Sequence, residues 1–373
     1  MIDWIALNMT PGVGPRAATK LLERFGSADA VFHARRTELE SLRLKPETIE
    51  CIIKREFEEK AKVELERVKQ LGGDVLILDD GSYPHLLREI DDPPPVLYVK
   101  GDWQACFDQP GVGVIGSRTC STYGENSSEM LARDLGSRGI TITSGLARGI
   151  DAAAHRGAIR GQGRTIAVMG TGIDNVYPRE NTKLTREILD AGGCLVTQFP
   201  LGTPPLKDNF PYRNRIISGL SLGVLIVEAS ERSGSLITAR LAAEQGREVM
   251  AVPGNITSGN SFGTNYLIKS GAKLVQQWQD VVSELPPEIA ASILPPKIEE
   301  NGQRQSKQPV APTDLTDHEH KVWSLLTPDD ATHIDILLQT SGLSFGDLNN
   351  ALVSLDIRDL IRVLPGKNYA RRM

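Results

Sequence analysis

The chain has few cysteines for its length, and none of them is placed for metal binding. Only 4 cysteines occur among 373 residues. They are isolated from one another and form no C-x-x-C pair: Cys51, Cys106, Cys120 and Cys194. Zinc sites need closely spaced ligands, and disulfide frameworks are typical of small secreted chains. We therefore expect no metal site and no disulfide, as in a protein of the reducing cytoplasm.

The chain also lacks a long apolar run and an excess of positive charge. No stretch of about twenty apolar residues is present, so we expect no membrane span. Residues 1–5 lack the basic start of a signal peptide. The 42 lysines and arginines are outnumbered by 47 aspartates and glutamates, for a net charge of −5. Any nucleic-acid binding must therefore be confined to one groove.

Six short apolar runs recur at near-even spacing between residues 111 and 254, and segments of helical period separate most of them. The runs are 112–115, 140–143, 166–169, 195–199, 224–227 and 249–252. Strands that alternate with helices indicate βαβ units and a parallel sheet, which gives an α/β fold class. Ligands of such sheets bind outside the carboxyl ends of the strands. The function is therefore expected at that edge.

The loops after these runs combine small residues with cations. Glycine allows close approach of a backbone, helix amino ends attract anions, and arginine grips a phosphate with two hydrogen bonds. Each glycine could instead serve only a turn, and each arginine could be a solvated surface charge, as for Arg148 taken alone. The predicted phosphate-binding residues are Gly116, Ser117, Arg118, Ser144, Gly145, Arg148, Gly170, Gly172, Arg179, Lys207, Arg213, Asn214, Arg215, Ser233, Gly234 and Ser235.

A dinucleotide-dependent dehydrogenase is the first alternative that this pattern raises. Residues 111–116 fit G-x-G-x-x-G, but the first two glycines lie at or before the strand rather than in the turn after it. The second strand ends at Thr143 and Ser144, where an NAD site needs an acidic residue for the ribose. Hydride transfer is therefore not expected, and we expect no cofactor.

The amino-terminal part of the chain, residues 1–80, is helical in pattern. Residues 11–15 read Pro-Gly-Val-Gly-Pro and precede a second helical segment. Such a turn is typical of a helix-hairpin-helix, whose amides can hold a DNA phosphate, but it also fits a small helical bundle with a tight glycine turn. The sequence leaves both interpretations open. The predicted sheet domain covers residues 81–284.

The carboxyl-terminal part divides into a linker and a small domain. Residues 285–313 are rich in proline and charge, so we predict a flexible linker there. Residues 314–373 contain three helical segments and a hairpin around Pro365 and Gly366, which predicts a winged helix. A helix that reads duplex DNA should be basic, yet the third helix region carries Asp347, Asp356 and Asp359 against only Arg358. We therefore interpret this domain as a protein-interaction module.

Several motifs in the sheet domain together resemble the DNA-processing protein A family (DprA/Smf). They are Gly116-Ser-Arg118, Ser144-Gly-Leu-Ala-Arg-Gly-Ile-Asp151, Tyr177-Pro178 with Asn181, Phe210-Pro-x-Arg-Asn-Arg-Ile-Ile-Ser-Gly-Leu220 and Arg232-Ser-Gly-Ser-Leu-Ile-Thr-Ala239. The resemblance implies an extended Rossmann-like fold that binds single-stranded DNA, forms a homodimer through that fold and loads a RecA-type recombinase in natural transformation. It also implies no enzymatic activity.

Individual positions carry this resemblance further. Arg118 matches the arginine of the Gly-Ser-Arg loop, Arg179 a basic position after Tyr-Pro, and Lys207 the lysine before Phe-Pro-x-Arg-Asn-Arg. Gln198 departs from the family, because many members have glutamate there. A role that needs a carboxylate at this position is therefore in doubt.

An enzyme that cleaves nucleoside monophosphates at the glycosidic bond is the second alternative. Related Rossmann folds of that kind use a Pro-Gly-Gly-x-Gly-Thr loop with a nearby glutamate. Residues 232–238 read Arg-Ser-Gly-Ser-Leu-Ile-Thr, so this signature is missing. His155, four residues after Asp151, is a candidate general base. An Asp–His pair at this spacing on a helix more often serves capping and packing than catalysis. Release of free base would separate this alternative from DNA binding.

Overall fold

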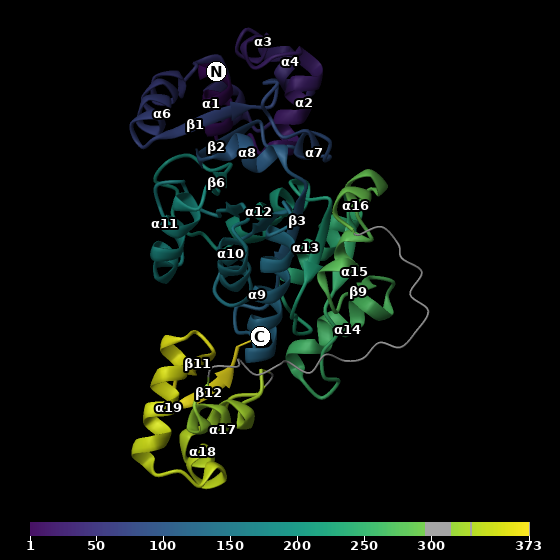
Figure 1. Cartoon of the computed structure of the whole chain (residues 1–373). Helices are drawn as coiled ribbons and strands as arrows, with labels where there is room; N and C mark the ends of the chain where they lie inside the picture. The colour runs from purple at the N-terminus through teal and green to yellow at the C-terminus, as the bar shows by residue number, and fades with distance from the viewer. Residues whose placement is uncertain (295–314, 329, 373) are drawn as a thin grey trace.

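The computed structural model describes residues 1–294, 315–328 and 330–372. Its helical amino-terminal region, central sheet domain and carboxyl-terminal domain follow one another from top to bottom in Figure 1. No helix among these residues is long and apolar enough to cross a membrane.

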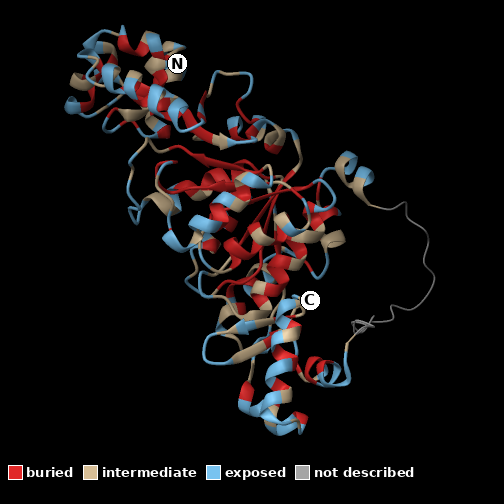
Figure 2. Ribbon diagram, turned by 60° about the vertical axis from the view of Figure 1, so that its left-hand side comes forward, coloured by how far each residue is buried: buried red, intermediate tan, exposed pale blue. Residues whose placement is uncertain are grey.

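The centre of the molecule is a nine-stranded, mostly parallel sheet, which confirms the predicted α/β fold. Its strands are β1 (Gly73–Ile77), β2 (Val96–Gly101), β3 (Gly111–Ile115), β4 (Thr141–Ser144), β5 (Thr165–Val168), β6 (Cys194–Thr197), β7 (Gly223–Ile226), β8 (Glu248–Ala251) and β9 (Lys273–Leu274). Their order is β1-β2-β6-β5-β4-β3-β7-β8-β9. β2 pairs in antiparallel fashion with both β1 and β6, and the other pairs are parallel. The inner strands β3 to β7 are fully buried, and Figure 2 shows this buried centre of the sheet.

Helices cover the sheet because their apolar faces pack against the buried strands. The main ones are α9 (Thr122–Gly136), α10 (Ile150–Arg160), α11 (Thr182–Asp190), α12 (Asn209–Gly219), α13 (Ser235–Glu244) and α14 (Phe262–Lys269), with the short α8 (Trp103–Asp108) and α15 (Trp278–Val282). Ser121 caps α9 by accepting a hydrogen bond from the Gly124 amide at 3.1 Å. Leu131 and Leu135 of α9 are fully buried against the sheet.

The order of the strands creates one crevice at the carboxyl edge of the sheet. From β3 the chain runs outward through β4, β5 and β6, and it then returns to place β7 on the other side of β3. β3 and β7 are parallel neighbours, with Ile115 opposite Ile226. The loops after these two strands therefore diverge, and such a switch point is where parallel sheets bind ligands.

The amino-terminal region is a group of short helices that packs on the sheet domain. It contains α1 (Ile2–Met9), α2 (Pro15–Phe25), α3 (Ala28–Phe32), α4 (Arg36–Ser41), α5 (Pro46–Ile53) and α6 (Glu58–Gln70), and α7 (His85–Arg88) follows β1. Two contacts reach the segment after β6: Asn8 donates to the Gln198 carbonyl at 3.2 Å, and the Leu201 amide donates to Glu64 at 2.6 Å. β1 lies within the predicted helical region 1–80 but belongs to the sheet, because it pairs with β2.

The predicted linker differs from the structure in its first ten residues. Residues 287–293 form α16 (Pro287–Ile293), and Leu285 is buried in the core. Ile289 and Ile293 of α16 pack against that same core, so apolar packing outweighs the proline-rich composition here. The remainder of the predicted linker, 295–313, lies outside the described residues.

The carboxyl-terminal domain is the predicted winged helix. It consists of α17 (Asp317–Leu325), β10 (Thr332–His333), α18 (Ile334–Ser341), α19 (Phe345–Ile357), β11 (Ile361–Leu364) and β12 (Asn368–Arg371). β12 lies between β10 and β11 in a three-stranded sheet. Leu348, Leu352 and Leu355 of α19 are buried in the core of this domain, as their spacing predicts.

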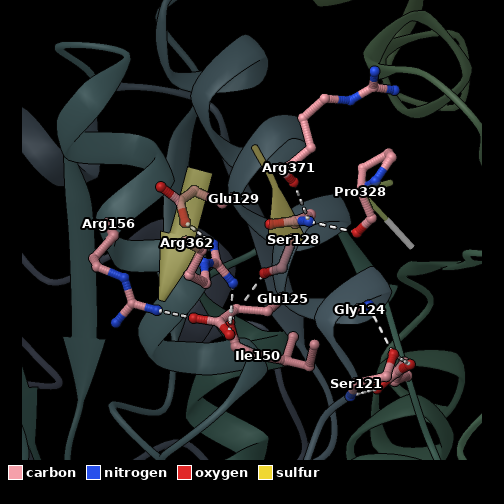
Figure 3. A network of polar contacts seen from close by, with 12 residues as sticks. Ser121, Gly124, Glu125, Ser128, Glu129, Ile150, Arg156, Pro328, Arg362 and Arg371 are labelled. Carbon is pink, nitrogen blue, oxygen red and sulfur yellow. Dashed lines mark hydrogen bonds and ion pairs between the residues drawn. The ribbon is translucent and has the colours of Figure 1, made fainter. Parts of the chain in front are cut away.

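The wing of this domain contacts α9 of the sheet domain through charged groups. Arg362 on β11 lies 2.6 Å from a carboxylate oxygen of Glu125 and 3.1 Å from one of Glu129 (Figure 3). Asn126 donates to the Pro328 carbonyl at 2.7 Å. The Arg362 side chain is only 11% exposed and that of Glu129 only 9%, so these charges are largely removed from water. The two domains therefore meet through a nearly buried ion-pair network, for which we use the name wing contact.

Candidate nucleic-acid interface

A cleft of about 570 Å³ opens at the switch point between β3 and β7. Three segments line it: the loop after β3 (residues 116–119), the start of α12 with the residues before it (205–214), and the loop after β7 with the start of α13 (230–238). We call this the strand-end cleft.

The loop after β3 is held close to the loop after β7. The Ser117 amide donates to the Glu228 carbonyl at 2.8 Å. A Cβ atom at Gly116 would lie 2.8 Å from that same carbonyl oxygen, so only glycine permits this approach. The turn leaves Arg118 exposed at the mouth of the cleft.

Two aromatic rings accompany Arg118. Its guanidinium carbon lies 5.4 Å from the centroid of the Phe210 ring, within the range of a cation–π contact. The Tyr177 and Phe210 centroids are 5.5 Å apart, and 43% of the Tyr177 surface is exposed. A cation beside exposed aromatic rings is the combination that holds a phosphate and stacks a base.

Arg213 places a fixed positive charge on the floor of the cleft. It is 3% exposed and donates to the carbonyls of Gly145, at 2.7 Å, and Val168. Burial lowers the pKa of Arg213 to about 10, so the side chain stays protonated at neutral pH. Asp151 is buried next to it and accepts from the Gly145 amide at 3.2 Å. Burial raises the pKa of Asp151, and the charge of Arg213 partly opposes this rise.

The third wall is formed by Ser233, Gly234 and Ser235 at the amino end of α13. The two serine hydroxyls hydrogen-bond to each other at 2.7 Å. No side chain caps the amino end of α13. The Ser235 amide makes a long hydrogen bond of 3.4 Å to the Ser233 hydroxyl, and the next two amides donate to the carbonyls of Ser233 and Gly234. The positive end of the helix dipole still favours an anion beside this wall.

The structure brings nine predicted residues into the strand-end cleft. They are Gly116, Ser117, Arg118, Lys207, Arg213, Asn214, Ser233, Gly234 and Ser235. Gly145 and Arg148 line an adjoining pocket of about 60 Å³ together with Arg118 and Tyr177. Arg148 is held by Glu180, whose Oε1 atom accepts from Nη2 at 2.7 Å. Arg179 is exposed but lines neither cavity.

Four predicted contact residues are buried instead, and their predicted role needs correction. Ser144 is fully buried and donates to the Val114 carbonyl at 2.6 Å. Gly170 and Gly172 are buried, and a Cβ atom at Gly170 would lie 2.9 Å from the Phe210 ring. Arg215 is 3% exposed and donates to the Asp92 carbonyl at 2.5 Å and to the Gln198 side chain. These residues support the cleft from beneath.

Three further observations refine the expectations from sequence. Glu228 does not pair with Arg213 or Arg215, because its carboxylate accepts from the Ser121 amide at 2.9 Å. The side-chain oxygen of Gln198 accepts a hydrogen bond from Arg215. Glutamine in place of the family's glutamate therefore still gives this arginine an acceptor, although a neutral one. The contact between Tyr177 and Phe210 was not foreseen, although both residues stand in the motifs quoted above.

The candidate base His155 is buried and neutral. Its Nδ1 atom lies 2.7 Å from the Thr165 hydroxyl, which itself donates to the Ile142 carbonyl, so Nδ1 must carry the proton. Burial lowers the pKa of His155 to about 3. Among the described residues, no group of three or more histidine, cysteine, aspartate or glutamate side chains could hold a metal ion.

Comparison with known proteins places these features in context. Residues 74–286 match the family described as DNA recombination-mediator protein A, and residues 306–367 match the DprA winged helix domain. Protein Smf of Escherichia coli is 41% identical over 296 residues, which cover 79% of this chain and 76% of that protein.

Two solved structures are similar to this one. The X-ray structure of DNA processing protein A from Streptococcus pneumoniae aligns with a TM-score of 0.68 and 36% identity, covering 77% of this chain and 98% of that one. The structure of the Helicobacter pylori protein, whose description concerns its single-stranded DNA binding mode, aligns with a TM-score of 0.51 and 31% identity. That alignment covers 57% of this chain and 94% of the other.

Proposed function

This chain belongs to the DNA recombination-mediator protein A family, and we propose that it binds single-stranded DNA in the strand-end cleft. The observation that carries the proposal is the position of Arg118. Its exposed guanidinium lies against the Phe210 ring at the mouth of a cleft that also contains Lys207 and Arg213. The description of the Helicobacter pylori relative, which names single-stranded DNA, agrees with this ligand.

The residues contribute to binding in different ways. Arg118 and Lys207 bind phosphates directly, since both are exposed. Arg179 extends the same surface, and Ser117, Asn214 and the serines at α13 donate further hydrogen bonds. Arg148 contributes less, because Glu180 already occupies its guanidinium. Arg213 is buried at the floor of the cleft and attracts the phosphates by its positive charge. Phosphate contacts carry no base identity, so binding is independent of sequence.

The protein acts as a recombination mediator rather than as an enzyme. It holds incoming single strands and transfers them to a RecA-type recombinase during natural transformation. A nucleotide-cleaving activity is disfavoured because His155 is buried, neutral and bonded to Thr165. All four cysteines are free thiols, which suits a reducing cytoplasm.

The homodimer forms through the sheet edge at β9. Ile256, Phe262 and Tyr266 are large apolar residues near this edge, and they are 92%, 54% and 60% exposed. Phe262 and Tyr266 are one turn apart on α14, so they share a face. Tyr266→Asp should give a monomer in light scattering, whereas Val63→Asp on α6, a site 55% exposed, should leave the dimer intact. An unchanged dimer in Tyr266→Asp would refute this arrangement.

A binding titration at several salt concentrations tests the proposed ligand. For about four neutralised phosphates, log affinity for oligo-dT should fall against log salt with a slope of roughly −3. Blunt duplex should bind more weakly at every salt concentration, because a stiff helix does not follow the walls of the cleft. Equal affinity for blunt duplex and for oligo-dT, or an affinity that does not change with salt concentration, would contradict the proposal.

A further inference from the structure

We infer that the amino-terminal helices hold a second phosphodiester site, and that one single strand passes from the strand-end cleft onto it. This inference rests on the proposed function. The site is a cleft of about 290 Å³ between α2 and the turn that joins α4 to α5. We call it the amino-terminal cleft.

The lining of the amino-terminal cleft is basic. It contains four cations and no carboxylate among residues Gly12, Arg16, Ala17, Lys20, Leu42, Arg43, Leu44 and Lys45. Lys20, Arg43 and Lys45 are exposed and form no ion pair with any described residue. In a chain whose net charge is −5, a concave site of this composition selects an anion.

The backbone around the cleft is built to bring these cations together. Gly12 has a φ of +84°, and a Cβ atom there would lie 2.3 Å from the Thr48 hydroxyl. That hydroxyl donates to the Pro11 carbonyl at 2.8 Å and so fixes the turn before α2 against α5. The tight turn foreseen from sequence therefore packs against α5, and it aligns Arg16 and Lys20 of α2 with Arg43 and Lys45 on the facing turn.

The two clefts are linked through Tyr212. A Cβ atom at Gly14, just before α2, would lie 3.1 Å from the Tyr212 hydroxyl, so the two segments are nearly in contact. Tyr212 is 38% exposed and follows Phe210 and Pro211, which line the strand-end cleft. Arg16 also lies 3.8 Å from Asp92, which sits 3.9 Å from Arg215 beneath that cleft. This junction places the partly exposed Tyr212 ring, which has Arg215 5.0 Å from its centroid, between two basic surfaces.

The ligand is therefore the sugar–phosphate backbone of a longer single strand. A base can stack on Tyr212 while phosphates on either side reach the two sets of cations. A free phosphate or a mononucleotide could occupy the amino-terminal cleft by the same chemistry, but it would not connect the clefts. Only a continuous strand makes affinity depend on length.

Oligonucleotide length separates this inference from the proposed function. Fluorescence anisotropy is measured with oligo-dT of about 5 nucleotides, which fills one cleft, and of about 20 nucleotides, which reaches both. The test variant combines Lys20→Ala, Arg43→Asn and Lys45→Ala. Asparagine is used because Arg43 has a φ of +56°, which asparagine tolerates. The control removes three cations from α6, on the other side of the helical region in Figure 1: Lys60→Ala, Arg67→Ala and Lys69→Ala.

The expected result is a loss confined to the longer strand. The test variant should bind the long oligonucleotide roughly tenfold more weakly than the parent, with a salt slope shallower by about 2, and it should bind the short one as before. The control should match the parent on both, and thermal unfolding should show all three proteins folded. Unchanged long-strand affinity in the test variant would overturn the inference while the proposed function stands. Failure of the parent to bind either length would overturn both.

Discussion

Arginines have opposite surroundings in the strand-end cleft and at the wing contact. Arg118 is exposed, lies over the Phe210 ring and forms no ion pair with a described residue, whereas Arg362 is 11% exposed and lies between Glu125 and Glu129. An exposed cation without a carboxylate partner is ready for an external anion. A nearly buried cation between two carboxylates is already neutralised. Its removal would leave Glu125 with Arg156 and Glu129 with Arg160, both within the sheet domain, and would remove their charged contact to the wing. The same residue type therefore indicates a ligand site in one place and a structural joint in the other.

The largest effect is expected at the wing contact. Arg362→Ala should weaken the attachment of the winged helix to α9 by about 2–3 kcal/mol, because two charge-assisted contacts to the wing would be lost, and Glu129 would keep only Arg160 of its own domain. Small-angle scattering should then report a more extended particle. Lys321→Ala, an exposed site on α17, should scatter like the parent protein. If Arg362→Ala also kept the compact scattering curve, the ion-pair network would not be what joins the domains.

Lowering the pH should destabilise the sheet domain through His155, whereas Arg118 and Arg362 should stay protonated. The pKa of His155 is lowered to about 3 by burial, against about 6.5 in an unfolded chain. Between pH 3 and pH 6.5 the unfolded chain binds a proton at His155 that the folded protein does not bind. The contribution of neutral His155 to the free energy of unfolding is therefore fully present above pH 6.5 and is lost as the pH falls. The loss should reach about 2 kcal/mol near pH 5.

His155→Gln should remove this component of the pH dependence. Urea unfolding of parent and variant near pH 7 and pH 5 measures it as the difference between their pH slopes. Buried Glu64 has a raised pKa and acts in the opposite direction, but it is common to both proteins and cancels. Parallel slopes would mean that His155 is not held neutral in the folded state.

A smaller effect is expected from single cations of the strand-end cleft. Arg118→Ala should weaken oligo-dT binding roughly tenfold, or about 1.4 kcal/mol, through the loss of one charge-assisted phosphate contact. The melting temperature should not change, since the side chain is exposed. Arg148→Ala is the matched comparison within the same region, and its effect should be smaller because Glu180 already binds that guanidinium. An Arg148 effect equal to that of Arg118 would remove the distinction between free and paired arginines.

The smallest effect should follow removal of the winged helix. A protein that ends after Leu294 retains α16 and its packing on the core. Its oligo-dT affinity should stay within about twofold of that of the full chain, since none of the described residues of the winged helix lines the strand-end cleft. A large drop in affinity would show that the winged helix contributes to DNA binding directly, contrary to our interpretation of its acidic third helix.

The sequence predicts the sheet and the edge of the sheet where the strand-end cleft lies, because these depend on local patterns. The apolar runs predict the strands, and the loops after them contain Arg118 and Lys207, which the sequence predicts as phosphate-binding residues. It does not predict which polar residues of those loops are buried. Ser144 and Arg215 look like their exposed neighbours until tertiary packing covers them. The wing contact joins Arg362 to Glu129, which is 233 residues earlier, and no local pattern encodes such a pairing.

Hydrogen exchange with and without oligo-dT tests the central contrast most directly. Bound DNA should slow exchange in residues 116–119, 205–214 and 230–238, which line the strand-end cleft. Exchange in residues 122–136 of α9 and 361–371 of the wing should not change, since their charges are already satisfied by each other. Protection concentrated at the wing contact, or no protection in the three cleft segments, would contradict this account.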